Sequence, residues 1–182
     1  MANSVLSIIT PVEIISQSLG ILALICNIIC YQMKDAKKLL FWQITASVIW
    51  VLNLGLKGAI AGVLLNIHAV VRLCVFYLAE NHAWARSKAW VPIFMVSAAV
   101  IIIVTYTGFP DILALIGTLF TIYSFSAGDT SKTRLFTLPS PPCWFVYHLM
   151  QRNIGGVLNE IFVLGSIIVG MIRMDKKSSK KQ

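Results

Sequence analysis

Long apolar stretches separated by short polar connections run through most of the chain. A membrane-spanning helix needs about 20 mostly apolar residues. Seven stretches meet or approach this length: 12–32, 39–56, 59–79, 90–107, 110–127, 135–150 and 154–173. Lipid offers no hydrogen-bond partner to the backbone, so helices are the expected form of all seven. The sixth is short and contains Pro139, Pro141 and Pro142. The pattern predicts an all-α integral membrane protein with seven transmembrane helices.

Composition supports a membrane setting for these helices. Of the 182 residues, 58% are apolar and 12% are charged, which is too little charge to cover a soluble domain of this length. No basic cluster precedes the first apolar stretch, so we expect a retained helix there and not a removed signal peptide. The net charge of +8 is carried by connections and by the basic tail, which suits anionic lipid better than nucleic acid.

Lys and Arg are divided unevenly between the two sides of this seven-helix map. Twelve fall in the first, third and fifth connections and the C-terminal tail: Lys34, Lys37, Lys38, Arg86, Lys88, Lys132, Arg134, Arg173, Lys176, Lys177, Lys180 and Lys181. Lys57 and Arg152 fall on the opposite side, and Arg72 lies within a span. Cytoplasmic connections carry the excess of cationic residues. We therefore predict an N-terminus outside the cell and a C-terminus in the cytoplasm.

The second half of the chain repeats features of the first half at a shift of 94 residues. The aligned pairs are Trp50 with Trp144, 61–64 with 155–158, and Asn66 with Glu160. Three helices per copy, joined by one linker helix, give two bundles in the same orientation, as in transporters with parallel repeats. The predicted parts are a first three-helix bundle (1–79), a linker helix (80–108), a second three-helix bundle (109–174) and a basic cytoplasmic tail (175–182).

With these features the chain resembles the bacterial inner-membrane YgjV-type family over about residues 12–175. The residues that carry the likeness are Gln17-Ser18-Leu19-Gly20, Lys34-Asp35-Ala36-Lys37-Lys38, Asn66 through Arg72, Cys143-Trp144, and Gly155-Gly156 through Glu160. The 3+1+3 plan also looks like the SWEET/PQ-loop (MtN3-like) transporter superfamily. The resemblance implies a SWEET-like fold, a multi-pass location in the bacterial inner membrane, and transport of a small solute.

The same resemblance implies which residues would bind that solute. In each SWEET half, a Trp on the second helix and an Asn on the third line a central pocket. Here the matching residues are Trp50 with Asn66 and Trp144 with Glu160, and Asn159 joins this substrate-binding set. Gating is assigned to Tyr31 and Gln32, which replace the Pro-Gln signature at the end of the first helix, and to the hinge prolines Pro139, Pro141 and Pro142.

Ionisable side chains at membrane depth cost about 3 kcal/mol or more when unpaired, and they therefore indicate function or pairing. Glu160 is expected to bind a solute hydroxyl or amine, to carry a proton, or to form a static pair with Arg72. His68 lies four residues before Arg72, hence on the same helix face, and belongs to the same coupling or buried-pair group. Alternatively, Arg72 snorkels to the cytoplasmic interface. A solvated interface explains His148.

Bond-breaking chemistry is not indicated by the sequence. There is no nucleophile–base pair, metal-ligand cluster or phosphate-binding loop, so no catalytic residue, metal or cofactor is predicted. The leading hypothesis is a transporter or facilitator for a sugar or another small polar metabolite, working by alternating access. The alternative is a non-transport sensor or assembly protein whose polar residues are structural, and a lipid-modifying enzyme ranks third. The expected partners are the bilayer and the solute, without nucleic acid, and a homo-oligomer is left open.

Overall fold

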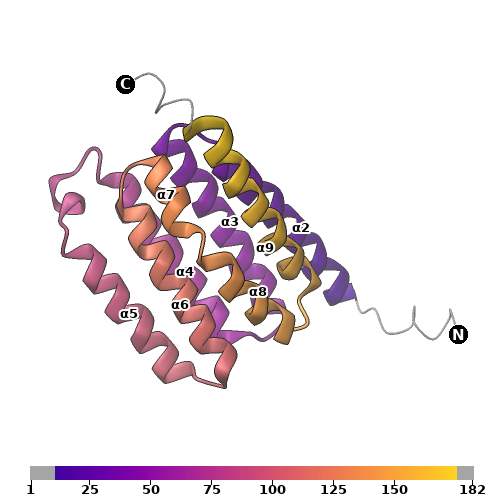
Figure 1. Cartoon of the computed structure of the whole chain (residues 1–182). Coiled ribbons are helices and arrows are strands. Elements are labelled where there is room, and N and C mark those ends of the chain that lie inside the picture. The colour runs from indigo at the N-terminus through magenta and orange to yellow at the C-terminus, as the bar shows by residue number, and fades with distance from the viewer. Residues whose placement is uncertain (1–10, 176–182) are drawn as a thin grey trace, which may run out of the picture.

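A computed structural model describes residues 11–175 and shows a bundle of helices (Figure 1). No strand is present in that range. The helices are α2 (Pro11–Tyr31), α3 (Ala36–Leu56), α4 (Ile60–Leu78), η1 (Ala83–Arg86), α5 (Trp90–Thr105), α6 (Phe109–Ser126), α7 (Thr130–Thr137), α8 (Ser140–Met150), α9 (Ile154–Gly170) and η2 (Met171–Asp175). The long helices follow the order of the predicted apolar stretches, except that two short helices, α7 and α8, stand in place of the sixth stretch.

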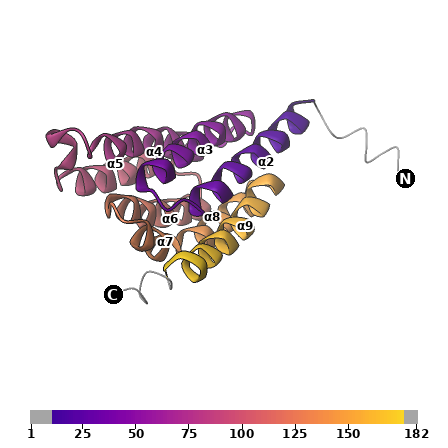
Figure 2. The ribbon, with the colours of Figure 1, turned by 90° about the horizontal axis from the view of Figure 1, so that it is seen from above.

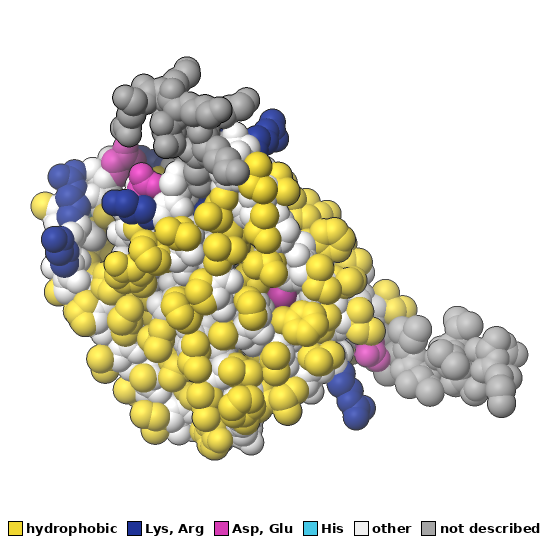
Figure 3. Space-filling model, in the orientation of Figure 1, with side chains coloured by type: hydrophobic (Ala, Val, Ile, Leu, Met, Phe, Trp, Pro, Cys, Tyr) yellow, Lys and Arg dark blue, Asp and Glu magenta, His cyan; other side chains and the backbone are white. Residues whose placement is uncertain are grey.

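Five helices of the described chain are long and apolar enough to cross a membrane. They are α2, α3, α4, α6 and the segment Ile154–Arg173 that includes α9. α5 is also apolar but has 16 residues. Its Ile103 and Val104 are 75% and 78% exposed, as lipid-facing side chains would be. Figure 3 shows hydrophobic side chains covering most of the side of the bundle that faces the viewer, with most of the visible Lys and Arg at one end. The all-helical, multi-pass membrane architecture is therefore confirmed.

The prediction of a single sixth helix over 135–150 is wrong, because this stretch belongs to two short helices. α7 begins earlier, at Thr130, where the Asp129 side chain accepts hydrogen bonds from two backbone N–H groups of the first turn. It ends at Thr137. Pro139, Pro141 and Pro142 have no N–H to donate, so three helical hydrogen bonds are lost at this point. α8 begins at Ser140, and prolines in its first turn are well tolerated.

Together, α7 and α8 run the length of α9. At one end, Thr137 donates to the Ser124 hydroxyl near the end of α6, and a Cβ on Gly170 at the end of α9 would meet the Arg134 side chain. At the other end, the ring of His148 lies against Gly156 at the start of α9. The broken pair therefore occupies the place that the sequence pattern assigned to one helix.

The helices form two layers. α2, α3 and α4 are consecutive neighbours in one layer, and α6, the α7–α8 pair and α9 form the other. α2 packs on α9 at one edge, while α4 meets α6 at the opposite edge. α5 lies at that second edge, in contact with both α4 and α6 (Figure 2). Three helices on each side thus enclose a central space.

Two glycines make the same contact in each layer. A Cβ on Gly62 would lie 2.6 Å from the Tyr147 hydroxyl oxygen of α8 and 2.9 Å from the Leu54 side chain, and a Cβ on Gly156 would overlap the ring of His148. Leu54 and His148 are 94 residues apart, as are Gly62 and Gly156. Each glycine therefore lets the last helix of its triplet pack closely on the middle one, in the register of the sequence repeat.

Replacing Gly156 with alanine should lower stability, because the new Cβ has no room beside His148. We expect Gly156→Ala to cost about 1–3 kcal/mol, as overpacking does, measured by thermal unfolding in detergent. Gly165→Ala, also on α9, is the matched control, since nothing lies within 4 Å of its Cβ position. It should be neutral or slightly stabilising because alanine favours helix. Equal losses in both variants would refute the close packing.

Candidate functional site

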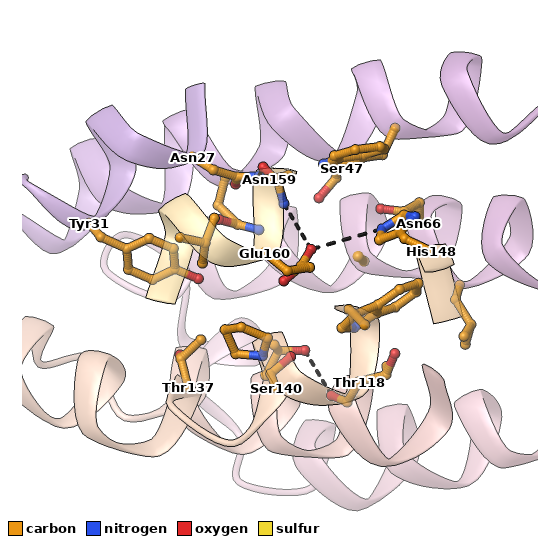
Figure 4. Close-up of a pocket in the computed structure, with 18 of the residues that line it drawn as sticks. Asn27, Tyr31, Ser47, Asn66, Thr118, Thr137, Ser140, His148, Asn159 and Glu160 are labelled. Atoms are coloured by element: carbon orange, nitrogen blue, oxygen red, sulfur yellow. Dashed lines mark hydrogen bonds and ion pairs between the residues drawn. The ribbon is translucent and has the colours of Figure 1, made fainter. Parts of the chain in front are cut away.

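A polar cavity of about 80 Å³ lies between the two layers. Its walls come from α2, α3 and α4 on one side and from α6, α7, α8 and α9 on the other. The cavity brings together the predicted substrate-binding residues Trp50, Asn66, Trp144, Asn159 and Glu160. Figure 4 shows several of these side chains directed into the same space. Residues far apart in the sequence thus share one buried polar environment.

The predicted gating and coupling residues are divided. Tyr31, Arg72 and Pro141 line the cavity, whereas His68, Gln32, Pro139 and Pro142 are not in its wall. His68 faces α5 instead, where its Nε2 lies 2.9 Å from the Ser97 hydroxyl and its ring meets Phe94 edge-on. Although their spacing on α4 predicts a common face, only Arg72 reaches the cavity, and His68 does not.

A chain of amide hydrogen bonds ends on Glu160. The Asn27 amide nitrogen donates to Asn159 Oδ1 at 2.9 Å, and the Asn159 amide nitrogen donates to Glu160 Oε1 at 2.8 Å. All three side chains are at least nine-tenths buried. Each amide must present its nitrogen to the next acceptor, so the orientation of both amides follows from the network. α2 and α9 are joined at this point, and Glu160 is held on the cavity wall.

The expectation of a solvated His148 is wrong, because this side chain is 2% exposed. Its ring centroid lies 5.0 Å from that of Trp50 and 5.8 Å from that of Trp144. Its Nε2 is 3.9 Å from Glu160 Oε1. The packing of α8 on α9 through Gly156 turns the imidazole inward. His148 is therefore a cavity residue that helical position alone did not reveal.

The position of the proton on His148 follows from its neighbour Asn153. Asn153 Oδ1 accepts from the backbone N–H of Gly156 at 3.2 Å, so its amide nitrogen points the other way. That nitrogen donates to Asn53 Oδ1 at 2.8 Å and lies 3.4 Å from His148 Nδ1. Nδ1 is thus the acceptor, and in the neutral ring Nε2 carries the hydrogen toward Glu160.

Arg72 neither snorkels nor pairs with Glu160. Its side chain is 2% exposed, and its guanidinium donates to the Thr118 carbonyl of α6 at 3.5 Å. Within residues 11–175, Arg72 Nε has no hydrogen-bond partner, and Glu160 lies beside His148 instead, with 3.9 Å between His148 Nε2 and Glu160 Oε1. Snorkelling was expected from position along α4, but α6 covers this side of α4 and keeps the guanidinium inside.

Beyond the cavity, toward the start of α9, further polar groups join the helices. Gln17 Oε1 accepts from the Gly155 N–H at 2.8 Å, beside the close approach of Gly20 and Gly155. Asn53 Nδ2 donates to the Ser16 carbonyl at 2.6 Å. Together with the bond from Asn153, these contacts join α2, α3 and α9, as expected for amides that bridge membrane helices.

A second set of contacts joins the opposite ends of the same helices. The Gln32 amide donates to the carbonyl and hydroxyl of Ser166 on α9. Arg134 on α7 is 1% exposed and donates to the carbonyls of Tyr31 and Met33. The Tyr31-Gln32 pair therefore lies where the end of α2 is tied to both α7 and α9.

Several hydroxyl and amide residues of the wall were not predicted from the sequence. They are Asn27, Gln43, Ser47, Thr118, Thr121, Thr137 and Ser140. Hydroxyl groups are common in membrane helices, where they bond to carbonyls of their own helix, as Thr121 does to Thr118. The aligned positions Ser47 and Pro141 both lie in the wall, so the repeat was the signal that could have found Ser47.

A larger hollow, of about 910 Å³, lies at the end of the bundle where α3 begins and α4 ends. Its charged residues are mostly engaged with their neighbours. Lys37 Nζ lies 2.9 Å from a Glu80 carboxylate oxygen, and Arg86 donates to the carbonyls of Ala79 and Glu80. These contacts fasten η1 to the end of α4, which explains the charges without a ligand.

The fold and the cavity define a multi-pass helical membrane protein with a buried polar chamber between two three-helix layers. The model of the Imp-YgjV family, described as "Bacterial inner membrane protein", matches residues 14–178, and the chain belongs to this family. Its multi-pass inner-membrane location follows. Comparison with curated proteins and with solved structures found no match. The functional assignment therefore depends on the geometry of the cavity.

Replacing Asn153 with alanine should destabilise the bundle, because Asn53 and the Gly156 N–H would each lose a buried partner. A loss of about 1–3 kcal/mol is expected for such groups, measured by thermal unfolding in detergent. Asn81→Ala, at an exposed position after α4, is the matched control and should change little. A stability unchanged in Asn153→Ala would show that the network does not hold the layers together.

Proposed function

We propose that this protein carries a small polar solute across the inner membrane by alternating access, and that it is not an enzyme. The observation that supports this most strongly is the cavity itself. Most of the residues that line it are buried, many of them are polar, and both three-helix layers contribute to it. Buried polar groups are costly inside a membrane bundle and tend to mark solute or ion pathways. Binding between two repeats is the arrangement that rocking-bundle carriers use.

The proposed topology has seven crossings in a 3+1+3, SWEET-like arrangement. α2 and α9 run in the same direction, since Gln17 contacts Gly155, Asn27 contacts Asn159, and Gln32 contacts Ser166. Parallel first and last helices require an odd number of crossings. α5 and the broken α7–α8 pair supply the two beyond the five long helices. The excess of Lys and Arg then favours an outside N-terminus and a cytoplasmic C-terminus.

Alternating access would proceed by exchanging the two sets of contacts at the ends of α2 and α9. Opening the outer end breaks the bonds around Gln17, Asn53 and Asn153. Opening the inner end breaks those of Gln32 and Arg134. The interruption between α7 and α8 provides a place where one layer bends while its two halves stay helical. Asn66, Asn159 and Glu160, with Trp50 and Trp144, would bind the solute, which with the lipid bilayer is a proposed partner.

A thiol-accessibility experiment tests alternating access without knowledge of the solute. In a variant whose four native cysteines are replaced by alanine, Ser47→Cys and Ser140→Cys place a thiol in the cavity wall from each layer. We expect a membrane-impermeant maleimide to label both positions in right-side-out and in inside-out vesicles. A carrier exposes the same wall to each side in turn.

Ser97→Cys is the control, because Ser97 packs against His68 and is not in the cavity wall. It should remain unlabelled from both sides. Labelling of the cavity positions from one side alone, or from neither, would contradict alternating access. That result would favour the alternative, a sensor or assembly protein whose polar residues only join helices.

A further inference from the structure

The cavity contains a carboxyl group and a guanidinium that do not pair with each other. Glu160 and Arg72 both line it, yet each has other neighbours: Asn159 and His148 for Glu160, and the Thr118 carbonyl for Arg72. Both side chains are at least nine-tenths buried. Buried charges are costly unless they are paired and hydrogen-bonded. The wall therefore has a negative part and a positive part, both available to a bound molecule.

At the positive part, the guanidinium of Arg72 has few hydrogen-bond acceptors. Its hydrogen bond to Thr118 is long, at 3.5 Å, and among the described residues its Nε has no acceptor at all. A guanidinium presents five N–H donors in a fork that matches a carboxylate. A carboxylate group on the solute would satisfy donors that the helices leave free.

At the negative part, acceptors and aromatic faces gather. Glu160 offers its carboxylate, and Asn27 Oδ1 is buried without a hydrogen-bond donor among residues 11–175. Asn27 and Glu160 are held at this place by Asn159, which bonds to both. Trp50 and Trp144 lie in the same wall, and indole faces attract cations. Acceptors together with indoles form a suitable site for an ammonium group.

The size of the cavity restricts the solute further. Its volume is about 80 Å³, well below the roughly 300–1,000 Å³ of pockets for drug-sized ligands. The cavity therefore suits a solute of only a few non-hydrogen atoms.

Building on the proposed transport function, we propose that the solute is a small zwitterion bearing both an ammonium and a carboxylate, such as a small amino acid. Its ammonium would lie at Glu160 and Asn27, and its carboxylate at Arg72. Such a molecule enters without changing the net charge of the site and meets a group of opposite sign at each end. A neutral sugar, a simple amine or a simple carboxylate would leave at least one buried charge without a counterpart.

Ligands that differ by one charged group test this directly on the purified protein. Thermal unfolding is followed with glycine and L-alanine, and in parallel with L-alaninamide, propionate, glycerol and D-glucose. L-alaninamide lacks the carboxylate, and propionate lacks the ammonium. We expect glycine or L-alanine to raise the unfolding midpoint in a saturable, concentration-dependent way, because a ligand that binds the folded state stabilises it. The other four should produce little or no shift.

Two variants assign the two ends of the ligand. Arg72→Gln and Glu160→Gln should each weaken binding of the zwitterion by at least about tenfold, the loss that follows from deleting one charged hydrogen bond. Arg86→Gln and Glu80→Gln are the matched controls, because both residues lie outside the cavity, and they should leave the affinity unchanged. Should a cavity variant fail to fold, the ligand series on the unaltered protein still decides the question.

The outcomes separate this inference from the proposed function. Stabilisation by glycerol or D-glucose, without any by the zwitterions, would overturn the inference and leave transport standing. Equal stabilisation by propionate or L-alaninamide would also overturn it, since one charge would then suffice. No stabilisation by any of the six, in a protein whose cavity thiols label from both sides, would reject the zwitterion alone. If labelling fails as well, both proposals are wrong.

Discussion

The structure depends on one constraint: a polar group inside a membrane bundle must find its partner within the protein. Asn27, Asn53, Asn153 and Asn159 satisfy this constraint for one another and for neighbouring backbone groups across α2, α3 and α9. Lipid tails are as apolar as the side chains that they contact, so apolar burial does little to drive helices together. Amide contacts of this kind and close glycine packing therefore hold the layers together. Among the described residues four buried polar atoms have no hydrogen-bond partner, and two of them, Arg72 Nε and Asn27 Oδ1, belong to residues of the cavity wall, while His68 Nδ1 and Tyr147 Oη lie outside it.

Most of the fold could be predicted from hydrophobicity alone. The stretch 59–79 became α4 at Ile60–Leu78, and 110–127 became α6 at Phe109–Ser126, because spans of this kind are set by length and apolar content. The sixth stretch could not be placed in this way. Its helix starts at a capping aspartate within a polar sequence, Asp129, and is then interrupted by prolines. Local backbone chemistry determines those boundaries, and hydropathy does not report it.

Only those site residues that the internal repeat or the SWEET pattern marked could be predicted from the sequence. Together they named Trp50, Trp144, Asn66 and Glu160, and these residues do share one cavity. They gave no information about which face of a helix meets which neighbour. His148 was therefore misplaced, because its inward direction depends on the contact with Gly156. Position along a helix gives depth in the membrane, but burial depends on the helix packed opposite, and a single sequence does not specify that.

The two edges of the bundle differ in a way that bears on how it can move. α2 and α9 are fastened to each other at both extremities by Gln17 with Gly155 and by Gln32 with Ser166. The other edge, between α4 and α6, has α5 against it. The proposed opening breaks one of these two sets of contacts at a time, so the layers would tilt about the set that remains. Because α5 contacts both α4 and α6, it would have to follow this tilt at the second edge, and the bilayer beside α5 would be disturbed in each cycle.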